Sequence, residues 1–94
     1  KPLTIDMRKR SEFQLQYLTD AINIPLNEIN NHLAEFPKDK PFILHCAGGY
    51  RSMIAASMLK QRGWDNFSDV IGGFTEIAKT NVPKSEYVCP STML

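Results

Sequence analysis

The sequence predicts an α/β fold in which a small parallel β-sheet is covered by helices. Short apolar segments alternate along the chain with segments whose apolar residues recur at helical spacing. The connections between the apolar segments are long enough for the crossovers that parallel strands require. Residues 41–46 (PFILHC) form a continuous apolar run, which is typical of a strand covered on both faces. Because such sheets bind ligands beyond the carboxyl ends of their strands, we expect a functional site at that edge.

The first half of the chain predicts two strands and two helices. Residues 3–6 (LTID) form a short, apolar, partly β-branched strand, and residues 21–25 (AINIP) form a second strand that its proline closes. Between them, Ser11 is a suitable N-terminal cap for a short helix over residues 12–18. Asn27 is the expected cap of the next helix, because the apolar residues that follow fall at helical spacing. These apolar residues are Ile29, Leu33 and Phe36.

The second half predicts a similar alternation. After the strand at 41–46, a helix with an apolar stripe begins near Ser52, and Gly63 stands where a left-handed residue is expected to end it. The stripe consists of Ile54, Ala55, Met58 and Leu59. Residues 67–71 (FSDVI) predict a further strand. The last expected elements are a tight turn at 72–73, a short helix at 74–80 and an extended tail at 85–91.

Length, charge and cysteine content limit the class of protein. The 94 residues suffice for one small domain. Eleven basic and ten acidic residues leave a net charge of +1, so we expect neither a nucleic-acid nor a membrane partner. No apolar segment approaches the roughly 20 residues that span a bilayer. Two cysteines make a poor disulfide framework, which favours a reducing, cytoplasmic environment.

The loop that follows residues 41–46 carries the strongest chemical signal. Cysteine attacks as a thiolate, so a catalytic Cys46 needs a pKa below its usual value of about 8.5. A helix start near Ser52 directs a positive dipole at the loop, and Gly48 with Gly49 allows backbone N–H groups to form an anion nest. Arg51 adds a positive charge beside that nest. A buried strand cysteine followed by a plain turn is the alternative, but the ordered combination favours an anion-binding nucleophile loop.

Four segments resemble, in order, the motifs of the rhodanese (sulfurtransferase) domain family, single-domain type. They are DMRKRSEF (6–13), AINIP (21–25), HCAGGYRS (45–52) and GWDNFSDVIGGF (63–74). The resemblance implies a rhodanese-like domain over residues 1–94, with helices on both faces of the sheet; a free-standing domain and one excised from a longer chain both stay open. It also implies a sulfurtransferase of the EC 2.8.1 class that moves sulfane sulfur through a persulfide on Cys46. Its donor would be thiosulfate or a low-molecular-weight persulfide, and its acceptor a thiol or cyanide.

The resemblance also implies roles for individual residues. Cys46 is the expected catalytic residue, and no metal or organic cofactor is expected. The expected substrate-binding loop consists of Ala47, Gly48, Gly49, Tyr50, Arg51 and Ser52. The residues expected to support this loop from behind are Asp6, Arg8, Gly72 and Gly73. We expect Arg8 to pair with Glu12 four residues later, and we interpret His45 as structural because neighbouring strand residues face opposite ways.

Two other functions remain open at this point. Cysteine-dependent phosphatases, including those on the same fold, carry one residue more between cysteine and arginine than the four between Cys46 and Arg51. The shorter loop favours a bound sulfur atom over a phosphate. A non-catalytic binding or regulatory module, fused to a larger hydrolase or served by a partner domain, is the other alternative. The cysteine argues against it, because inactive copies commonly lose that residue.

The chain departs from the family pattern in places that affect these expectations. Tyr17 and Asp20 stand where the family has a histidine and a glycine in a structural turn. Ala47 stands where several thiosulfate-preferring members have arginine, which makes the dianion thiosulfate a poorer donor. We expect the family's usual N-terminal strand and helix before residue 3 to be absent from these residues, and the tail at 86–90 is a candidate to replace that strand.

Overall fold

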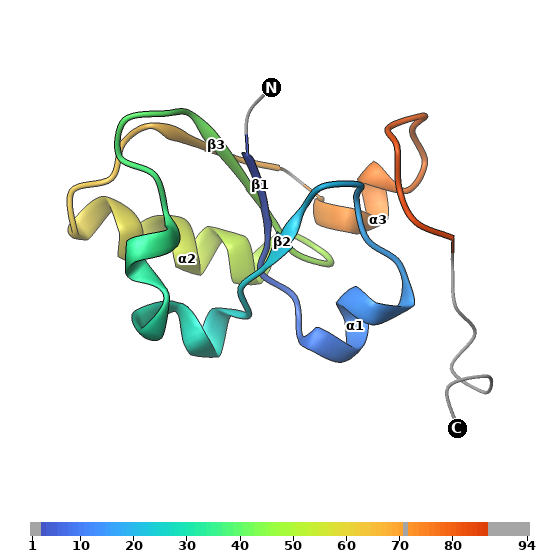
Figure 1. The fold of residues 1–94 in the computed structure, drawn as a ribbon, viewed down its shortest axis with the longest axis horizontal. Helices are drawn as coiled ribbons and strands as arrows, with labels where there is room; N and C mark the ends of the chain where they lie inside the picture. The colour runs from blue at the N-terminus through green and yellow to red at the C-terminus, as the bar shows by residue number, and fades with distance from the viewer. Residues whose placement is uncertain (1–2, 71, 87–94) are drawn as a thin grey trace.

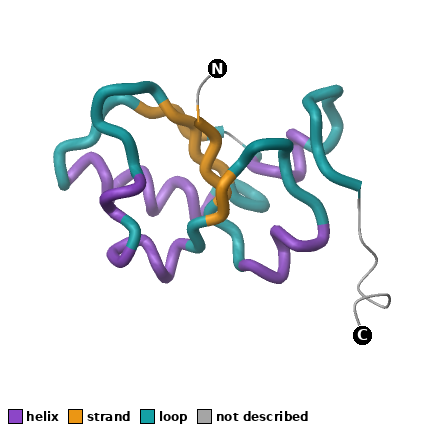
Figure 2. Tube along the Cα trace, in the orientation of Figure 1, coloured by secondary structure: helices purple, strands orange, loops and turns teal. Residues whose placement is uncertain are grey.

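The computed structural model describes residues 3–70 and 72–86. It confirms the predicted α/β class, because its four strands form one parallel sheet in the order β2-β1-β3-β4. The strands gather in the centre and helical segments flank them on both sides (Figures 1 and 2). The strands are β1 (Leu3–Asp6), β2 (Ile22–Asn23), β3 (Phe42–His45) and β4 (Phe67–Asp69), and the helices are α1 (Arg10–Leu15), α2 (Tyr50–Gln61) and α3 (Gly73–Ile77). None of the helices in the two described ranges is long and apolar enough to cross a bilayer.

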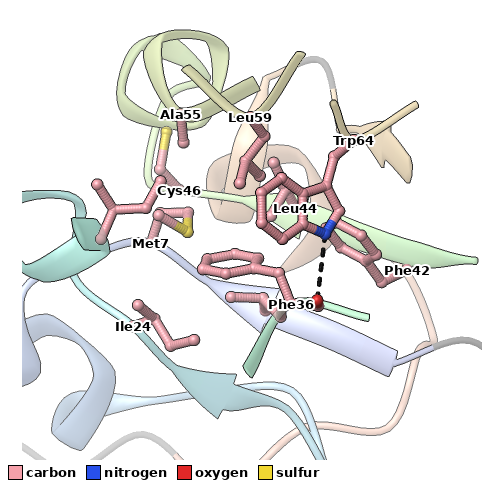
Figure 3. Packing of buried hydrophobic residues seen from close by; sticks show 11 residues of the cluster. Met7, Ile24, Phe36, Phe42, Leu44, Cys46, Ala55, Leu59 and Trp64 are labelled. Atoms are coloured by element: carbon pink, nitrogen blue, oxygen red, sulfur yellow. Dashed lines mark hydrogen bonds between the residues drawn. The ribbon is translucent and has the colours of Figure 1, made fainter. Parts of the chain in front are cut away.

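The two faces of the sheet differ in polarity. Because side chains alternate along a strand, Ile5 and Leu44 face the main core, whereas Asp6 and His45 face the opposite side. Figure 3 shows the main core, where the indole N–H of Trp64 donates to the carbonyl of Phe36 at 3.1 Å. The buried members of this core are Ile5, Met7, Ile24, Ile29, Phe36, Phe42, Leu44, Cys46, Ala55, Leu59 and Trp64. A hydrophobic core on one face therefore leaves a buried polar pair on the other.

Strands β1 and β3 end level with each other, at the edge where the sequence predicts the site. Asp6 pairs in register with His45, and the N–H of Met7 donates to the carbonyl of His45 at 2.7 Å. On the other side of β3, the N–H of Val70 donates to that strand at 3.0 Å. Cys46, the residue after β3, therefore lies at the edge where the chain leaving β1 meets the chain leaving β4.

Helix α1 begins differently from the prediction. Ser11 lies in its first turn, and Lys9 is the N-cap, so the predicted serine cap is wrong. The carboxylate of Glu12 closes the start of the helix instead, because it accepts the backbone N–H of Lys9 at 3.0 Å. The side chain that fixes this helix start also reaches the candidate site.

The segment predicted as a helix capped by Asn27 is not an α-helix. It forms two 3-10 helices, η1 (Leu26–Asn31) and η2 (Leu33–Glu35). Asparagine is a weak helix former because its side chain competes for backbone hydrogen bonds, and η1 contains three asparagines. Ile29 and Phe36 nevertheless reach the core, each with 2% of its surface exposed. Their apolar spacing thus predicts burial correctly, although it does not predict the type of helix.

Helix α2 begins two residues before the predicted start at Ser52, and this shortens the loop. Gly49 is the N-cap and has a φ of +102°, which residues with a side chain rarely adopt. The first N–H groups of a helix have no partner within the helix. The N–H groups of Arg51 and Ser52 are therefore available to the loop.

The remaining differences concern one helix face and the chain ends. On α2, Ala55 is buried as predicted, but Ile54 is 49% exposed, so the apolar stripe is narrower than predicted. Gly63 has the predicted left-handed conformation, with a φ of +97°. Ile71, predicted as the end of a strand, lies outside the described residues, and so do residues 87–94, with the greater part of the predicted tail and the second cysteine.

The segment after α3 is hydrogen-bonded to the segment after α1. The N–H of Ser85 donates to the carbonyl of Tyr17 at 2.7 Å, and its hydroxyl accepts the N–H of Tyr17 at 2.9 Å. The N–H of Thr19 donates to the carbonyl of Pro83 at 3.0 Å. We call residues 83–85 the strap; in Figure 1 they lie in the orange-red segment beside the blue chain between α1 and β2.

Helix α3 contacts the chain after β3 through its backbone. The N–H of Phe74 donates to the carbonyl of Cys46 at 2.5 Å, and the N–H of Thr75 donates to the carbonyl of Ala47 at 3.1 Å. Gly73 has a φ of +58°, and a Cβ at this position would lie 2.2 Å from the carbonyl oxygen of Cys46. A residue with a side chain therefore cannot replace this glycine without moving the loop.

We expect Gly73→Ala to destabilise the protein, because the left-handed backbone alone costs roughly 1–2 kcal/mol and the clash with backbone adds to it. The thermal midpoint should fall by about 4–8 °C for each kcal/mol lost. Gly48→Ala is the matched control, since a Cβ there meets nothing within 4 Å. Thermal unfolding followed by circular dichroism compares the two; equal midpoints would contradict the role assigned to Gly73.

Candidate functional site

The candidate site is centred on Cys46, which is 1% exposed. Figure 3 shows Cys46 beside Ala55 of α2, with Met7 on its other side. Its Sγ atom accepts the N–H of Gly49 at 3.1 Å and lies 3.5 Å from the Oγ atom of Ser52. The thiol therefore occupies the inside of the loop that joins β3 to α2.

Hydrogen bonds lower the pKa of the Cys46 thiol. Burial is the largest single influence and raises this pKa, because a buried thiolate loses its water. The hydroxyl of Ser52 and the backbone N–H groups of Ser52, Gly49 and Arg51 favour the thiolate, and together they outweigh burial. The net pKa is lower than that of an ordinary thiol, which is the condition that a nucleophilic cysteine must meet.

The orientation of the loop follows from its contacts with α3. The carbonyls of Cys46 and Ala47 are turned toward α3, where they accept backbone N–H groups. The hydroxyl of Thr75 adds a third bond, to the carbonyl of Ala47 at 2.9 Å. Because these carbonyls face away from the thiol, the N–H groups farther along the loop are left to surround it.

Arg51 is paired with Glu12 of α1, which differs from the sequence expectation. Its two terminal nitrogens bond the two carboxylate oxygens of Glu12, at 2.5 Å and 3.0 Å. The hydrogen bond from Arg51 is the main cause that lowers the pKa of Glu12, and it also raises the pKa of Arg51. The expected free positive charge beside the nest is therefore balanced by a carboxylate.

Arg8 pairs with Asp6, so the predicted pair between Arg8 and Glu12 is wrong. The Nη2 atom of Arg8 lies 2.7 Å from Oδ2 of Asp6, and both side chains are buried. Arg8 also donates to the carbonyl of Gln16 at 2.6 Å and lies over the ring of Phe74, 4.2 Å from its centroid. These contacts join the end of β1 to α1 and α3, behind the loop rather than beside the thiol.

His45 is fully buried on the face of the sheet opposite Cys46. Its ring lies 5.9 Å from that of Phe74, and its Nε2 atom lies 3.9 Å from Asp6. Neither ring nitrogen has a hydrogen-bond partner among the described residues. Burial lowers the pKa of His45 against the opposing charge of Asp6, so the ring is neutral at pH 7 and packs as a structural group.

The structure brings the predicted loop together and adds residues that sequence reasoning missed. Gly49, Arg51 and Ser52 act on the thiol, whereas the Tyr50 side chain is 76% exposed and points to solvent. Glu12, Met7 and Thr75 were not predicted at the site. No local spacing signals them, because each belongs to a segment far from residues 46–52 in the chain.

Three hollows surround the loop. The largest, about 550 Å³, is lined by Met7, Lys9, Arg10, Pro25, Leu26, Asn27, Glu28 and Arg51. A second, about 280 Å³, includes Gly48, Gly49, Tyr50 and Asp69, and a third, about 270 Å³, includes Arg8, Glu12, Ala47 and Phe74. Within residues 3–70 and 72–86, no cluster of three or more histidine, cysteine or acidic side chains is arranged to hold a metal ion.

The comparison with protein families agrees with this geometry. The family model described as the rhodanese-like domain matches residues 1–80. A protein named sulfurtransferase from Allochromatium vinosum is 30% identical over 81 residues, which cover 86% of this chain and 76% of that protein.

Longer proteins also contain similar segments. The protein named adenylyltransferase and sulfurtransferase uba4 from Ogataea parapolymorpha is 34% identical over 76 residues, or 80% of this chain. This chain spans only 20% of the length of that relative. Among solved structures, a rhodanese-related protein from Thermoplasma volcanium has a TM-score of 0.80 and 30% identity, covering 88% of this chain and 82% of its own.

We expect Ser52→Ala to raise the pKa of Cys46, because the Ser52 hydroxyl is the strongest of the groups that lower it. The rate of alkylation against pH measures this value. In the parent chain, the midpoint should fall below the usual thiol value of about 8.5. Ser57→Ala, on the exposed side of the same helix, is the control and should leave the midpoint unchanged. An unchanged midpoint in Ser52→Ala would show that this hydroxyl does not lower the pKa of Cys46.

The two histidines predict opposite responses of stability to acid. The pKa of His45 is lower in the folded protein, so the unfolded chain binds more protons and stability falls as pH drops below about 6.5. The hydrogen bond from His32 to Glu35 raises the pKa of His32, so its contribution is present at low pH and is lost as pH rises.

Urea unfolding between pH 7.5 and 5.5 tests this difference. On acidification, His45→Phe should lose less stability than the parent chain, whereas His32→Gln should lose slightly more. If His45→Phe and the parent lose the same amount, His45 is not neutral in the folded state.

Proposed function

The chain belongs to the rhodanese-like domain family, and we propose that it is a sulfurtransferase carrying sulfane sulfur on Cys46 as a persulfide. The observation that carries the proposal is the set of hydrogen bonds directed at the Cys46 sulfur. The N–H of Gly49 donates to the sulfur at 3.1 Å, and the Ser52 hydroxyl lies 3.5 Å from it; these groups and the backbone N–H groups of Arg51 and Ser52 lower the pKa of the thiol. Donors of this kind stabilise a negative charge on sulfur without needing an ion.

In the first half-reaction, the Cys46 thiolate attacks the outer sulfur of the donor. A new S–S bond forms to Cys46, and the bond within the donor breaks with its electron pair leaving on the donor remnant. With thiosulfate as donor, the remnant is sulfite. The product on the protein is an anionic persulfide. We expect the N–H groups of Gly49 and Arg51 to stabilise the negative charge on its outer sulfur.

In the second half-reaction, an acceptor takes the outer sulfur. A thiolate or cyanide attacks it, the S–S bond to Cys46 breaks, and the electron pair returns to Cys46 as thiolate. No metal or organic cofactor enters either step. We propose small-molecule partners for both steps and a cytoplasmic setting, in which thiol acceptors remain reduced.

The engagement of Arg51 argues against a phosphatase. A cation that faces the centre of a loop strengthens the binding of a phosphate dianion beyond what N–H donors supply. Here both terminal nitrogens of the Arg51 guanidinium bond Glu12, and a serine hydroxyl faces the sulfur instead. The loop is also one residue shorter than the phosphatase pattern.

A non-catalytic module within a larger protein is the alternative from a different class. The observation that favours it is the length of the Ogataea relative, of which this chain spans a fifth. Such a module needs no nucleophile, so it does not account for a cysteine whose pKa is lowered by several aligned donors. The transfer activity is therefore the better supported proposal.

We expect the parent chain to gain the mass of one sulfur atom when it is incubated with a persulfide or thiosulfonate donor. Cyanide or a thiol should remove the added mass. Cys46→Ser should abolish both loading and turnover while the far-ultraviolet spectrum is retained, because the thiolate is the only nucleophile of the reaction. Intact-mass spectrometry measures loading, and aryl phosphates should not be hydrolysed.

Cys89→Ser is the matched control and should load like the parent chain. If Cys46→Ser still gains sulfur, or if Cys89→Ser no longer does, the assignment of the persulfide to Cys46 is contradicted. Phosphatase turnover that depends on Cys46 would overturn the argument from Arg51. A chain that binds donors without gaining sulfur would support the non-catalytic module.

A further inference from the structure

We propose that Glu12 determines which sulfur donors the site accepts, by balancing the charge of Arg51 and so disfavouring donors that bring two negative charges to the thiol. This inference rests on the proposed sulfurtransferase function and adds the class of donor. The favoured class carries a single negative charge at the reacting group. The unbalanced second charge of a dianion would be the basis of its rejection.

The pair between Glu12 and Arg51 has a defined geometry. Both carboxylate oxygens and both terminal guanidinium nitrogens take part, and each side chain is about one-third exposed. A two-bond pair of this kind holds its partners in one orientation. Arg51 is thereby kept from turning its charge toward the sulfur, although its backbone N–H still reaches Cys46.

The other arginines near the loop are also paired with carboxylates. Arg8 is paired with Asp6, and Arg10 is paired with Glu28 at 2.8 Å. All three arginines around the end of β1 and the start of α2 therefore have a carboxylate partner. Lys9, which lines the largest of the three hollows around the loop, has no ion pair among the described residues, but it is exposed to solvent. The surroundings of the thiol thus carry hydrogen-bond donors but little free positive charge.

The balanced charge of Arg51 affects which sulfur donors the site can bind. Backbone N–H groups compensate the single charge of a thiolate or a persulfide. A dianion that approaches this thiolate brings a second charge, which an arginine already paired with a carboxylate compensates only weakly. Ala47 supplies no cation in place of Arg51. The site is therefore built for a monoanionic sulfur donor.

Two donors that differ by one charge isolate this effect. Thiosulfate is a dianion, and methanethiosulfonate is a monoanion in which a methyl group replaces one charged oxygen. In both, the Cys46 thiolate forms a bond to the outer sulfur while the donor S–S bond breaks. The electron pair leaves on sulfite from thiosulfate and on methanesulfinate from methanethiosulfonate. No proton, oxidant or reductant takes part in this step.

Glu12→Gln tests the proposal, because glutamine keeps the shape and can still accept the N–H of Lys9 while it leaves Arg51 unbalanced. We expect the ratio of kcat/KM for thiosulfate to that for methanethiosulfonate to rise about tenfold at low salt. The rise should shrink in about 0.5 M salt, where charges are screened. Glu28→Gln breaks another arginine pair, in which neither Arg10 nor Glu28 is hydrogen-bonded to residues 46–52, and it should leave the ratio within about twofold.

The outcomes separate this proposal from the function on which it rests. If neither donor loads sulfur onto the parent chain, the sulfurtransferase function fails. If methanethiosulfonate loads the parent but Glu12→Gln leaves the ratio unchanged, or lowers both donors equally, Glu12 only holds the fold and the charge proposal fails. An equal rise of the ratio in Glu28→Gln would also overturn it, since the effect would then be general surface charge.

Discussion

The arrangement of the site depends on the backbone contact between α3 and the residues that follow β3. Because the carbonyls of Cys46 and Ala47 are bound by α3, they face away from the thiol. The loop can then present N–H groups inward and begin α2 at Gly49. Gly73 makes this contact feasible, since any larger residue would collide with the Cys46 carbonyl. Gly73, which is distant in sequence, thus determines that the N–H groups of the loop, and not its carbonyls, face the thiol.

A second level of organisation is electrostatic. The polar face of the sheet holds the buried pair of Asp6 and Arg8, and α1 adds the pair of Glu12 and Arg51. The pair of Glu12 and Arg51 joins α1 to α2, whereas Arg8, held by Asp6 two residues earlier, reaches the end of α1 and Phe74 of α3. Their common effect is to position α1 and α3 against the end of β1 and β3 while leaving little net charge there. Stabilisation of the thiolate is consequently assigned to dipoles and not to ions.

Much of this arrangement is predictable from local sequence, and the part that is not has a physical reason. The strands and the buried positions Ile29 and Phe36 follow from apolar spacing, which reports burial directly. The type of helix at 26–35 does not, because 3-10 and α geometry bury similar residues. The wrong pairing of Arg8 and Glu12 arose in the same way. Local spacing permits an ion pair, whereas the choice of partner depends on which segments the fold brings together.

The strap ties the C-terminal end of the described chain to the segment that follows α1. Gln16 bonds the carbonyl of Ser85 at 3.1 Å, across 69 positions of sequence. Closing so long a loop costs chain entropy, which the hydrogen bonds of the strap help to offset. The strap is hydrogen-bonded to the residues that directly follow α1, the helix that carries Glu12. Loss of the strap would therefore leave the C-terminal end of α1, and with it the Glu12 carboxylate that bonds Arg51, held by fewer contacts.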